Sequence, residues 1–160
     1  MGAGKSTIGK QLASSLGLEF MDSDQAIKDR TGVDIATIFE YEGEEGFRKR
    51  ETKVIEELTQ LENLVLATGG GAVTTPEAAN YLASRGFVVY LECSPDQQFE
   101  RTLHDKNRPL IQTDDPKATL VALMEQREPI YKETADLVVS TEKRSAASVV
   151  KDILKYFDEN

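Results

Sequence analysis

The chain opens with residue types that bind phosphate. Gly2, Gly4, Lys5 and Ser6, in the run MGAGKST, have the spacing of the second half of a phosphate-binding loop. Glycines let successive backbone N–H groups curl around phosphate oxygens, and the following helix presents its positive end to them. Lys5 can reach the outer phosphates of a nucleotide, and Ser6 can coordinate Mg²⁺. The run therefore predicts a nucleotide site, the plainer alternative being a glycine-rich tail.

Two carboxylates follow a short apolar run, in the segment DSD at 22–24. In open parallel sheets, ligand-binding side chains collect where strands end. Asp22 can turn toward magnesium-bound water beside Ser6, while Asp24 turns toward a substrate hydroxyl. Helix capping by Ser23 or Asp24 explains the same residues without chemistry, and both interpretations can hold.

Arginines and glycines supply candidate substrate contacts. Arg48 lies three residues before Glu51 on one helical face, so the glutamate can orient the guanidinium, and Arg127 lies near the end of a later helix. Bidentate arginines would suit a small carboxylate, although a lone surface cation is the alternative for Arg48 and compensation of a helix dipole is the alternative for Arg127. The glycines at 69–71 leave the backbone open to a ligand, the alternative being a loose turn.

The chain from 104 to 117 is polar and contains two prolines, which predicts a long loop of the kind that forms functional lids. Arg108 in this lid can close on phosphates and stabilise charge during phosphoryl transfer. Arg101 and Arg144 are weaker candidates for positions beside a nucleotide base.

Short apolar runs alternate with amphipathic stretches, which predicts an α/β fold with a parallel sheet flanked by helices. The expected strands span 18–21, 64–68, 87–91 and 137–141. The expected helices span 5–16, 24–30, 34–42, 44–61, 76–85 and 145–157, with two more starting near 95 and 115.

A phosphate loop connects a strand to a helix, and that strand normally lies centrally in the sheet. The first glycine of the usual loop pattern would also precede Met1. Burial of five apolar side chains contributes about 8 to 15 kcal/mol, comparable with the whole stability of a typical domain. We therefore expect about ten further native residues upstream, the alternative being a fold that does without the strand.

Composition limits the partners. The chain of 160 residues suits a single domain, and 28 acidic against 19 basic residues give a net charge of −9, which repels nucleic acid and anionic membranes. No apolar run approaches the roughly 20 residues of a membrane span. The single cysteine, Cys93, indicates a reducing compartment and is expected to be buried at a strand end, and the lone His104 cannot form a two-histidine site. A cytoplasmic monomer is expected, since no exposed apolar stripe stands out.

The motifs GAGKST, DSD followed by RTG, GEEGFRKRE, LATGGGAV, VVYLE, KNRPLI and REPIYKETAD together resemble the shikimate kinases across essentially the whole chain. The resemblance implies a nucleoside monophosphate kinase-like P-loop fold with a five-stranded parallel sheet, in one domain over 1–160 with a substrate-binding region at about 24–61 and a lid at about 104–117. It also implies transfer of the ATP γ-phosphoryl group to the 3-hydroxyl of shikimate, giving shikimate 3-phosphate and ADP in aromatic amino acid biosynthesis.

The same resemblance implies roles for individual residues. Asp24 would contact the ring hydroxyls as the candidate base, and Ser6 and Asp22 would hold Mg²⁺, Asp22 through water. Lys5, Asp24 and Arg108 would form the catalytic set. Shikimate would lie against Asp24, Arg48, Gly69, Gly70, Gly71 and Arg127. ATP would lie against Gly2, Ala3, Gly4, Lys5, Ser6, Thr7, Arg101, Arg108 and Arg144.

Two other interpretations stay open. The chain could be another small phosphate-loop kinase, such as one acting on gluconate, although a substrate without a carboxylate would leave both arginines unexplained. It could also be a non-catalytic relative that only binds nucleotide or a protein partner. The expected partners are shikimate and ATP, with no nucleic acid and no membrane.

Overall fold

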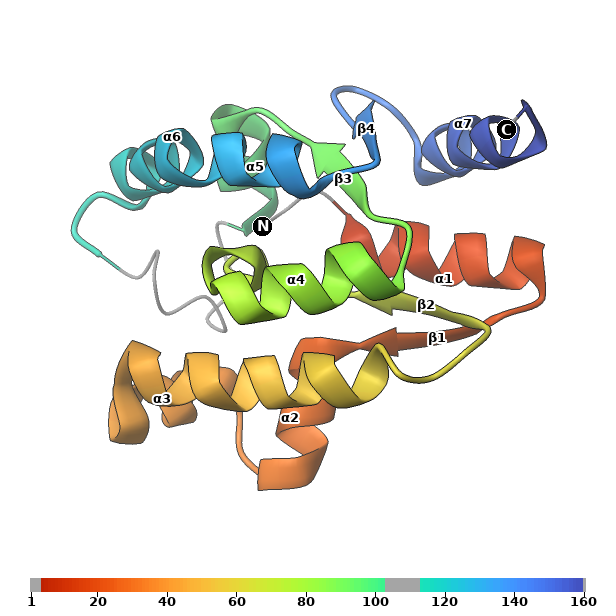
Figure 1. The fold of residues 1–160 in the computed structure, drawn as a ribbon. Coiled ribbons are helices and arrows are strands. Elements are labelled where there is room, and N and C mark those ends of the chain that lie inside the picture. Colours follow the sequence, from red (N-terminus) through yellow and green to blue (C-terminus); the bar gives the residue numbers. More distant parts are fainter. Residues whose placement is uncertain (1–3, 103–112, 160) are drawn as a thin grey trace.

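The computed structural model describes residues 4–102 and 113–159 (Figure 1). The strands are β1 (Glu19–Asp22), β2 (Leu64–Ala67), β3 (Val89–Glu92) and β4 (Leu137–Ser140). The helices are α1 (Lys5–Leu16), α2 (Ser23–Thr31), α3 (Ile35–Leu58), the 3₁₀ turn η1 (Ala72–Thr74), α4 (Pro76–Arg85), α5 (Pro95–Thr102), α6 (Pro116–Thr134) and α7 (Ala146–Glu159).

The strands pair in parallel, as predicted. β1 lies beside β2 with Glu19 opposite Leu64, and β3 lies beside β4 with Val89 opposite Leu137. Among the described residues these are two separate two-stranded sheets rather than one continuous sheet. Parallel neighbours need helical crossovers, which is why helices alternate with the strands in Figure 1.

Helix ends follow the local signals of the sequence. Helix α1 matches the predicted 5–16 and ends at Gly17, whose φ of +69° lets its N–H reach the carbonyls of the last turn. The two helices predicted at 34–42 and 44–61 form one element, α3, which is kinked at Gly43, where φ is +71° and ψ is −179°. The predicted break is therefore confirmed as a kink, although α3 ends at Leu58.

Three apolar clusters hold the elements together. One lies between α1, α7 and the strands, a second between α2, α3 and β1, and a third beneath α4. Cys93 follows β3 and is buried, as predicted, and burial raises the pKa of its thiol. Within the described ranges, no helix combines the length and apolar character needed to cross a membrane.

Some expectations fall outside the described residues. Most of the predicted lid, with His104 and Arg108, belongs to this part of the chain. Residues 113–117 of that segment are described, and they lead into α6, which begins at Pro116 and is capped by the Asp115 carboxylate accepting from the Ala118 N–H at 3.1 Å.

Candidate active site

The start of α1 lies against the ends of two strands. Gly4, with a φ of +81°, is the N-cap of α1, and the Lys5 ammonium donates to the carbonyl of Thr68, directly after β2. The Ser6 hydroxyl donates to Asp22 Oδ2 at 3.3 Å, at the end of β1. The fold thus brings Lys5, Ser6 and the acidic segment together. Gly2 and Ala3 lie outside the described residues, and Thr7 is exposed in the first turn of α1.

The two carboxylates of the acidic segment at 22–24 have different contacts. Asp22 Oδ1 accepts from the N–H groups of Asp24 at 2.8 Å and Gln25 at 3.2 Å, so Asp22 is the N-cap of α2. The prediction of capping by Ser23 or Asp24 was wrong about the residue, since the cap lies one position before Ser23. Asp24 instead reaches Gly69: a Cβ built on Gly69 would lie 3.2 Å from Asp24 Oδ1.

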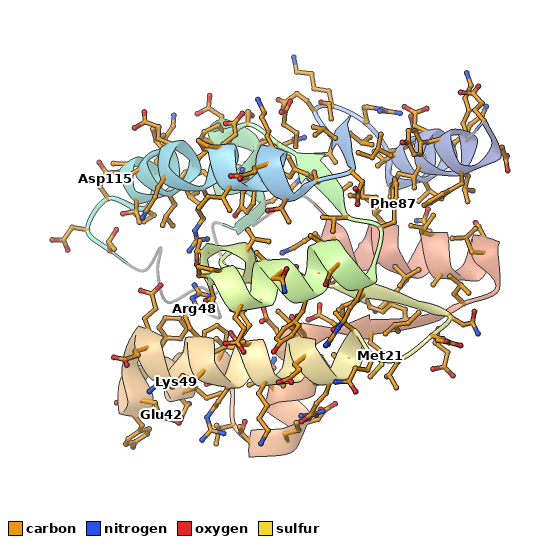
Figure 2. All side chains as sticks on the ribbon, in the orientation of Figure 1. Met21, Glu42, Arg48, Lys49, Phe87 and Asp115 are labelled. Atoms are coloured by element: carbon orange, nitrogen blue, oxygen red, sulfur yellow. The ribbon has the colours of Figure 1, made fainter. Side chains whose placement is uncertain are left out.

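An ion pair between a half-buried arginine and a buried glutamate lies beside this carboxylate. Arg48 Nη1 donates to Glu51 Oε1 at 2.8 Å, and Glu51 is only 1% exposed. Figure 2 shows Arg48 directed from α3 toward the middle of the molecule, away from Glu42 and Lys49 on the same helix. Arg48 Nε and Glu51 Oε2 are buried and have no hydrogen-bond partner within the described ranges. Buried polar groups without partners are typical of a ligand site. The ion pair with Glu51 excludes the lone surface cation.

The second arginine, Arg127, is more deeply buried than Arg48. Arg127 is 5% exposed and lies inside α6, which continues through Pro129 to Thr134. Four residues later on the same face, the Tyr131 hydroxyl donates to the Gly70 carbonyl at 2.5 Å. Burial raises the pKa of Tyr131, while the guanidinium groups of Arg127 and Arg48 act in the opposite direction. Both guanidinium groups therefore lie near enough to Tyr131 to act on its hydroxyl. The burial of Arg127 excludes the surface role considered for it.

Tyr131 is a site residue that the sequence prediction missed. Within the motif REPIY, the sequence predicts a site role for Arg127 but none for Tyr131. The available signal was the spacing of four residues, which puts Arg127 and Tyr131 on one helix face.

Gly71 makes room for the Arg48 guanidinium. A Cβ built on Gly71 would lie 2.1 Å from Arg48 Nη2 and 2.5 Å from its Cζ. The φ of Gly71 is −91°, so space rather than backbone conformation requires the glycine. The turn at 69–71 is therefore packed rather than loose, and it continues into η1.

We expect Gly71→Ala to displace Arg48 and to raise the KM for the carboxylate substrate by about tenfold or more, because a displaced bidentate contact loses its geometry. Steady-state kinetics and a thermal melt would test this expectation. Gly86→Ala is the matched control, since its Cβ would meet only Leu82 O, at 3.6 Å. An unchanged KM in the Gly71 variant would contradict the packing argument.

Glu51 predicts a specific pH dependence of stability. Burial raises its pKa above the ordinary 4.5, with Arg48 opposing the shift. A raised pKa means that the folded state binds the proton more tightly than the unfolded state, so this group's contribution to stability falls as pH rises from 4.5 through the raised value.

Glu51→Gln removes this titration. The unfolding free energy of the wild type, relative to that of Glu51→Gln, should therefore decrease as the pH rises from 4.5 through the raised pKa. Denaturant unfolding of both proteins at several pH values measures the difference. A difference that stays constant with pH would contradict the assignment.

The three arginines predicted to contact ATP differ in where the structure places them. Arg101 lies at the end of α5 beside the phosphate loop, with its Nη1 4.0 Å from a Cβ built on Gly4. Arg144 donates to Ser148 and to the Ser140 carbonyl, and it pairs with Asp152 at 2.8 Å. These contacts fasten the end of β4 to α7. Arg108 lies outside the described residues.

The oxygen donors near α1 fit a magnesium ion. Ser6 and Asp22 offer the hard oxygens that Mg²⁺ prefers, and Mg²⁺ normally takes few protein ligands beside water and phosphate. In the part of the chain that the structure describes, histidine, cysteine and carboxylate side chains form no group of three that could hold a metal by themselves. The donor set therefore suits an ion that arrives with a nucleotide.

Parallel strands with helical crossovers, and a lysine and a serine at the start of α1 beside strand-end carboxylates, define a kinase of the phosphate-loop class. The family model for shikimate kinase matches residues 1–158. The chain belongs to the shikimate kinase family.

Individual relatives agree. The chain is 58% identical to the shikimate kinase of Legionella pneumophila (strain Corby) over 156 residues, 98% of this chain and 89% of the relative. It is 54% identical to that of Actinobacillus pleuropneumoniae serotype 5b (strain L20), over 99% of this chain and 91% of the relative. The solved structure of shikimate kinase from Acinetobacter baumannii in complex with shikimate has a TM-score of 0.98 and 48% identity, over 100% of this chain and 89% of that one. The shikimate kinase of Aquifex aeolicus vf5 has a TM-score of 0.84 and 38% identity, over 99% and 92%.

Proposed function

We propose that the chain transfers the γ-phosphoryl group of ATP to the 3-hydroxyl of shikimate, giving shikimate 3-phosphate and ADP. The observation that carries this proposal is that the half-buried Arg48 and the buried Arg127 both act on Tyr131, whose hydroxyl donates to the glycine turn that Asp24 also approaches. One buried and one half-buried guanidinium group suit a small carboxylate ligand. Membership of the shikimate kinase family and the likeness to a shikimate-bound relative support the same substrate.

The arginines and the glycine turn would position shikimate. Arg48 and Arg127 bind its carboxylate, and Glu51 holds Arg48 in place through the 2.8 Å ion pair. Tyr131 fixes the turn by donating to the Gly70 carbonyl, which leaves the N–H groups of 69–71 as candidate donors to the ring hydroxyls. Holding the acceptor hydroxyl beside the phosphoryl donor supplies much of the rate in reactions of this class.

Asp24 would receive the proton in the chemical step. The bond from the γ-phosphorus to the bridging oxygen breaks, the bond to the shikimate 3-oxygen forms, and the hydroxyl proton passes to the Asp24 carboxylate. Lys5 stabilises negative charge on the transferring phosphoryl group, and Arg108 is proposed to do the same from the lid. Because the transition state is loose, Asp24 also acts by orienting the hydroxyl.

Ser6 and Asp22 would hold Mg²⁺ beside the ATP phosphates, Asp22 through water. When bound, the ion neutralises charge on the phosphate oxygens. Gly2 to Thr7 would surround the phosphates, and Arg101 and Arg144 would lie beside adenine. We also propose a cytoplasmic monomer, and the single cysteine supports the reducing compartment in this proposal.

A panel of acceptors tests the substrate. Shikimate, its carboxamide, gluconate and a neutral polyol would be offered with Mg–ATP, and ADP release would be followed by a coupled assay. We expect shikimate to be the preferred acceptor and its carboxamide to lose at least about tenfold in kcat/KM, because the amide lacks the charge that both arginines require. Equal use of the carboxamide, or preference for gluconate, would overturn the proposal.

A further inference from the structure

The guanidinium of Arg101 lies beside the start of α1, where the nucleotide phosphates are expected. Its Nη1 is 4.0 Å from a Cβ built on Gly4, the glycine that caps α1. Arg101 is exposed and belongs to the last turn of α5. Holding a long, exposed side chain in one conformation costs conformational entropy. Contacts that hold this guanidinium in place before the nucleotide arrives should therefore strengthen nucleotide binding.

The side chain of Gln97, one helical turn earlier on α5, lies between Arg101 and the carboxylate of Glu142. A guanidinium only donates hydrogen bonds and a carboxylate only accepts them, so the amide oxygen faces Arg101 and the amide nitrogen faces Glu142. In this orientation Gln97 Oε1 accepts from Arg101 Nη2 at 3.0 Å, and Nε2 donates to Glu142 Oε2 at 3.1 Å. The three side chains thus form one continuous chain of hydrogen bonds.

Glu142 belongs to a turn that is fixed to the ends of two strands. Its Oε2 also accepts from the Ser94 N–H at 3.2 Å, just before α5. The preceding residue, Thr141, is 1% exposed, and its N–H and hydroxyl donate to the Glu92 carbonyl at 2.8 and 2.9 Å. The turn after β4 is therefore fastened to the end of β3. The hydrogen-bond chain that reaches Arg101 starts from this fixed turn and not from α5 alone.

A neutral amide separates the cation from the carboxylate in this chain. A carboxylate in direct contact with Arg101 would also orient the guanidinium, but it would offset its positive charge. The amide oxygen of Gln97 orients the guanidinium without adding a negative charge next to the phosphate loop. Because phosphate groups are anionic, a negative charge at position 97 would oppose their binding. Glutamine therefore suits this position better than glutamate would.

We propose that Gln97 is a positioning residue for nucleotide binding: held by Glu142, it orients Arg101 toward the nucleotide at the start of α1. This inference rests on the proposed use of ATP and adds to it a residue that acts through Arg101. Neither Gln97 nor Glu142 is a candidate site residue in the sequence, because their contact joins two segments that are distant along the chain.

Calorimetric titration of the full chain with Mg–ATP, without shikimate, tests the role of Gln97. Gln97→Met keeps the length of the side chain but removes both hydrogen bonds, so we expect Mg–ATP binding to weaken by about three- to tenfold. Gln97→Glu should weaken binding further, because it puts a carboxylate against Arg101 and beside Glu142. The KM for shikimate should be unchanged in both variants. Gln60→Met, at an exposed glutamine after α3, is the matched control and should bind Mg–ATP as the wild type does.

A double-mutant cycle distinguishes positioning from a merely structural effect. If Gln97 acts through Arg101, Gln97→Met should cause no further loss of Mg–ATP affinity in an Arg101→Ala background. A loss of the same size in that background would overturn the proposal, and so would wild-type affinity in a folded Gln97→Met or Gln97→Glu chain. These outcomes leave shikimate phosphorylation by the wild type intact. A wild type that binds Mg–ATP but does not phosphorylate shikimate would instead contradict the proposed function, and the affinities of the variants would still decide the role of Gln97.

Discussion

Asp24→Asn is expected to lower the kcat for shikimate phosphorylation by about 10²- to 10⁴-fold, the usual contribution of a positioned general base. The carboxylate lies beside Gly69 at the start of α2, and its backbone N–H is held by Asp22 at 2.8 Å. Asparagine keeps the shape but cannot take the hydroxyl proton. The KM for ATP should change little, because the phosphate loop belongs to a different element.

The fold of the Asp24 variant should be intact. The negative charge of Asp24 is one of the groups that raise the pKa of Glu51, so its removal relieves a repulsion and should not lower the melting temperature. Asp29→Asn, an exposed carboxylate on the same helix that accepts from Gln25, is the matched control and should retain wild-type kcat. A folded Asp24→Asn enzyme with a kcat within about threefold of wild type would refute the role of Asp24 as base.

Arg48→Ala is expected to lower kcat/KM for shikimate by about 30- to 5,000-fold, corresponding to the 2 to 5 kcal/mol lost when one partner of a buried, hydrogen-bonded charge pair is truncated. Most of the loss should lie in the KM for shikimate, with the KM for ATP unchanged. Steady-state kinetics with each substrate varied in turn measures both effects.

The Arg48 variant also leaves Glu51 buried without its cation, so part of its phenotype would be instability. The double variant Arg48→Ala/Glu51→Gln separates the two effects, because it should recover stability without recovering shikimate affinity. Arg50→Ala is the control, since Arg50 pairs with Glu42 on the exposed side of α3. Wild-type shikimate KM in the folded double variant would contradict the carboxylate role.

Elements with strong local signals could be predicted from the sequence alone. Helix α1, its end at Gly17 and the kink at Gly43 follow from apolar spacing and from glycines in the left-handed region. The sequence predicts Arg127 near the end of a helix. In the structure α6 continues through Pro129 to Thr134 and buries Arg127 well inside the helix.

The candidate site could be predicted as a set of residue types but not as a set of contacts. The sequence predicts site roles for Lys5, Asp22 and Arg48 because residue type and motif spacing are local properties. The need for glycine at 71, to make room for Arg48, depends on two segments meeting in space. The Tyr131 bond to the Gly70 carbonyl spans 61 residues and has the same cause. The spacing of residues in the sequence does not show which distant segments come into contact.

The most direct test of the proposed function is shikimate-dependent ADP release from Mg–ATP by the folded 160-residue chain, with the product identified by ³¹P NMR. Circular dichroism and a cooperative melt would first establish that the chain is folded. We expect saturable ADP release that requires shikimate and yields one phosphate monoester on the 3-hydroxyl for each ADP. A folded chain that binds ATP but releases no ADP with shikimate, or that phosphorylates another acceptor in preference, would contradict the assignment.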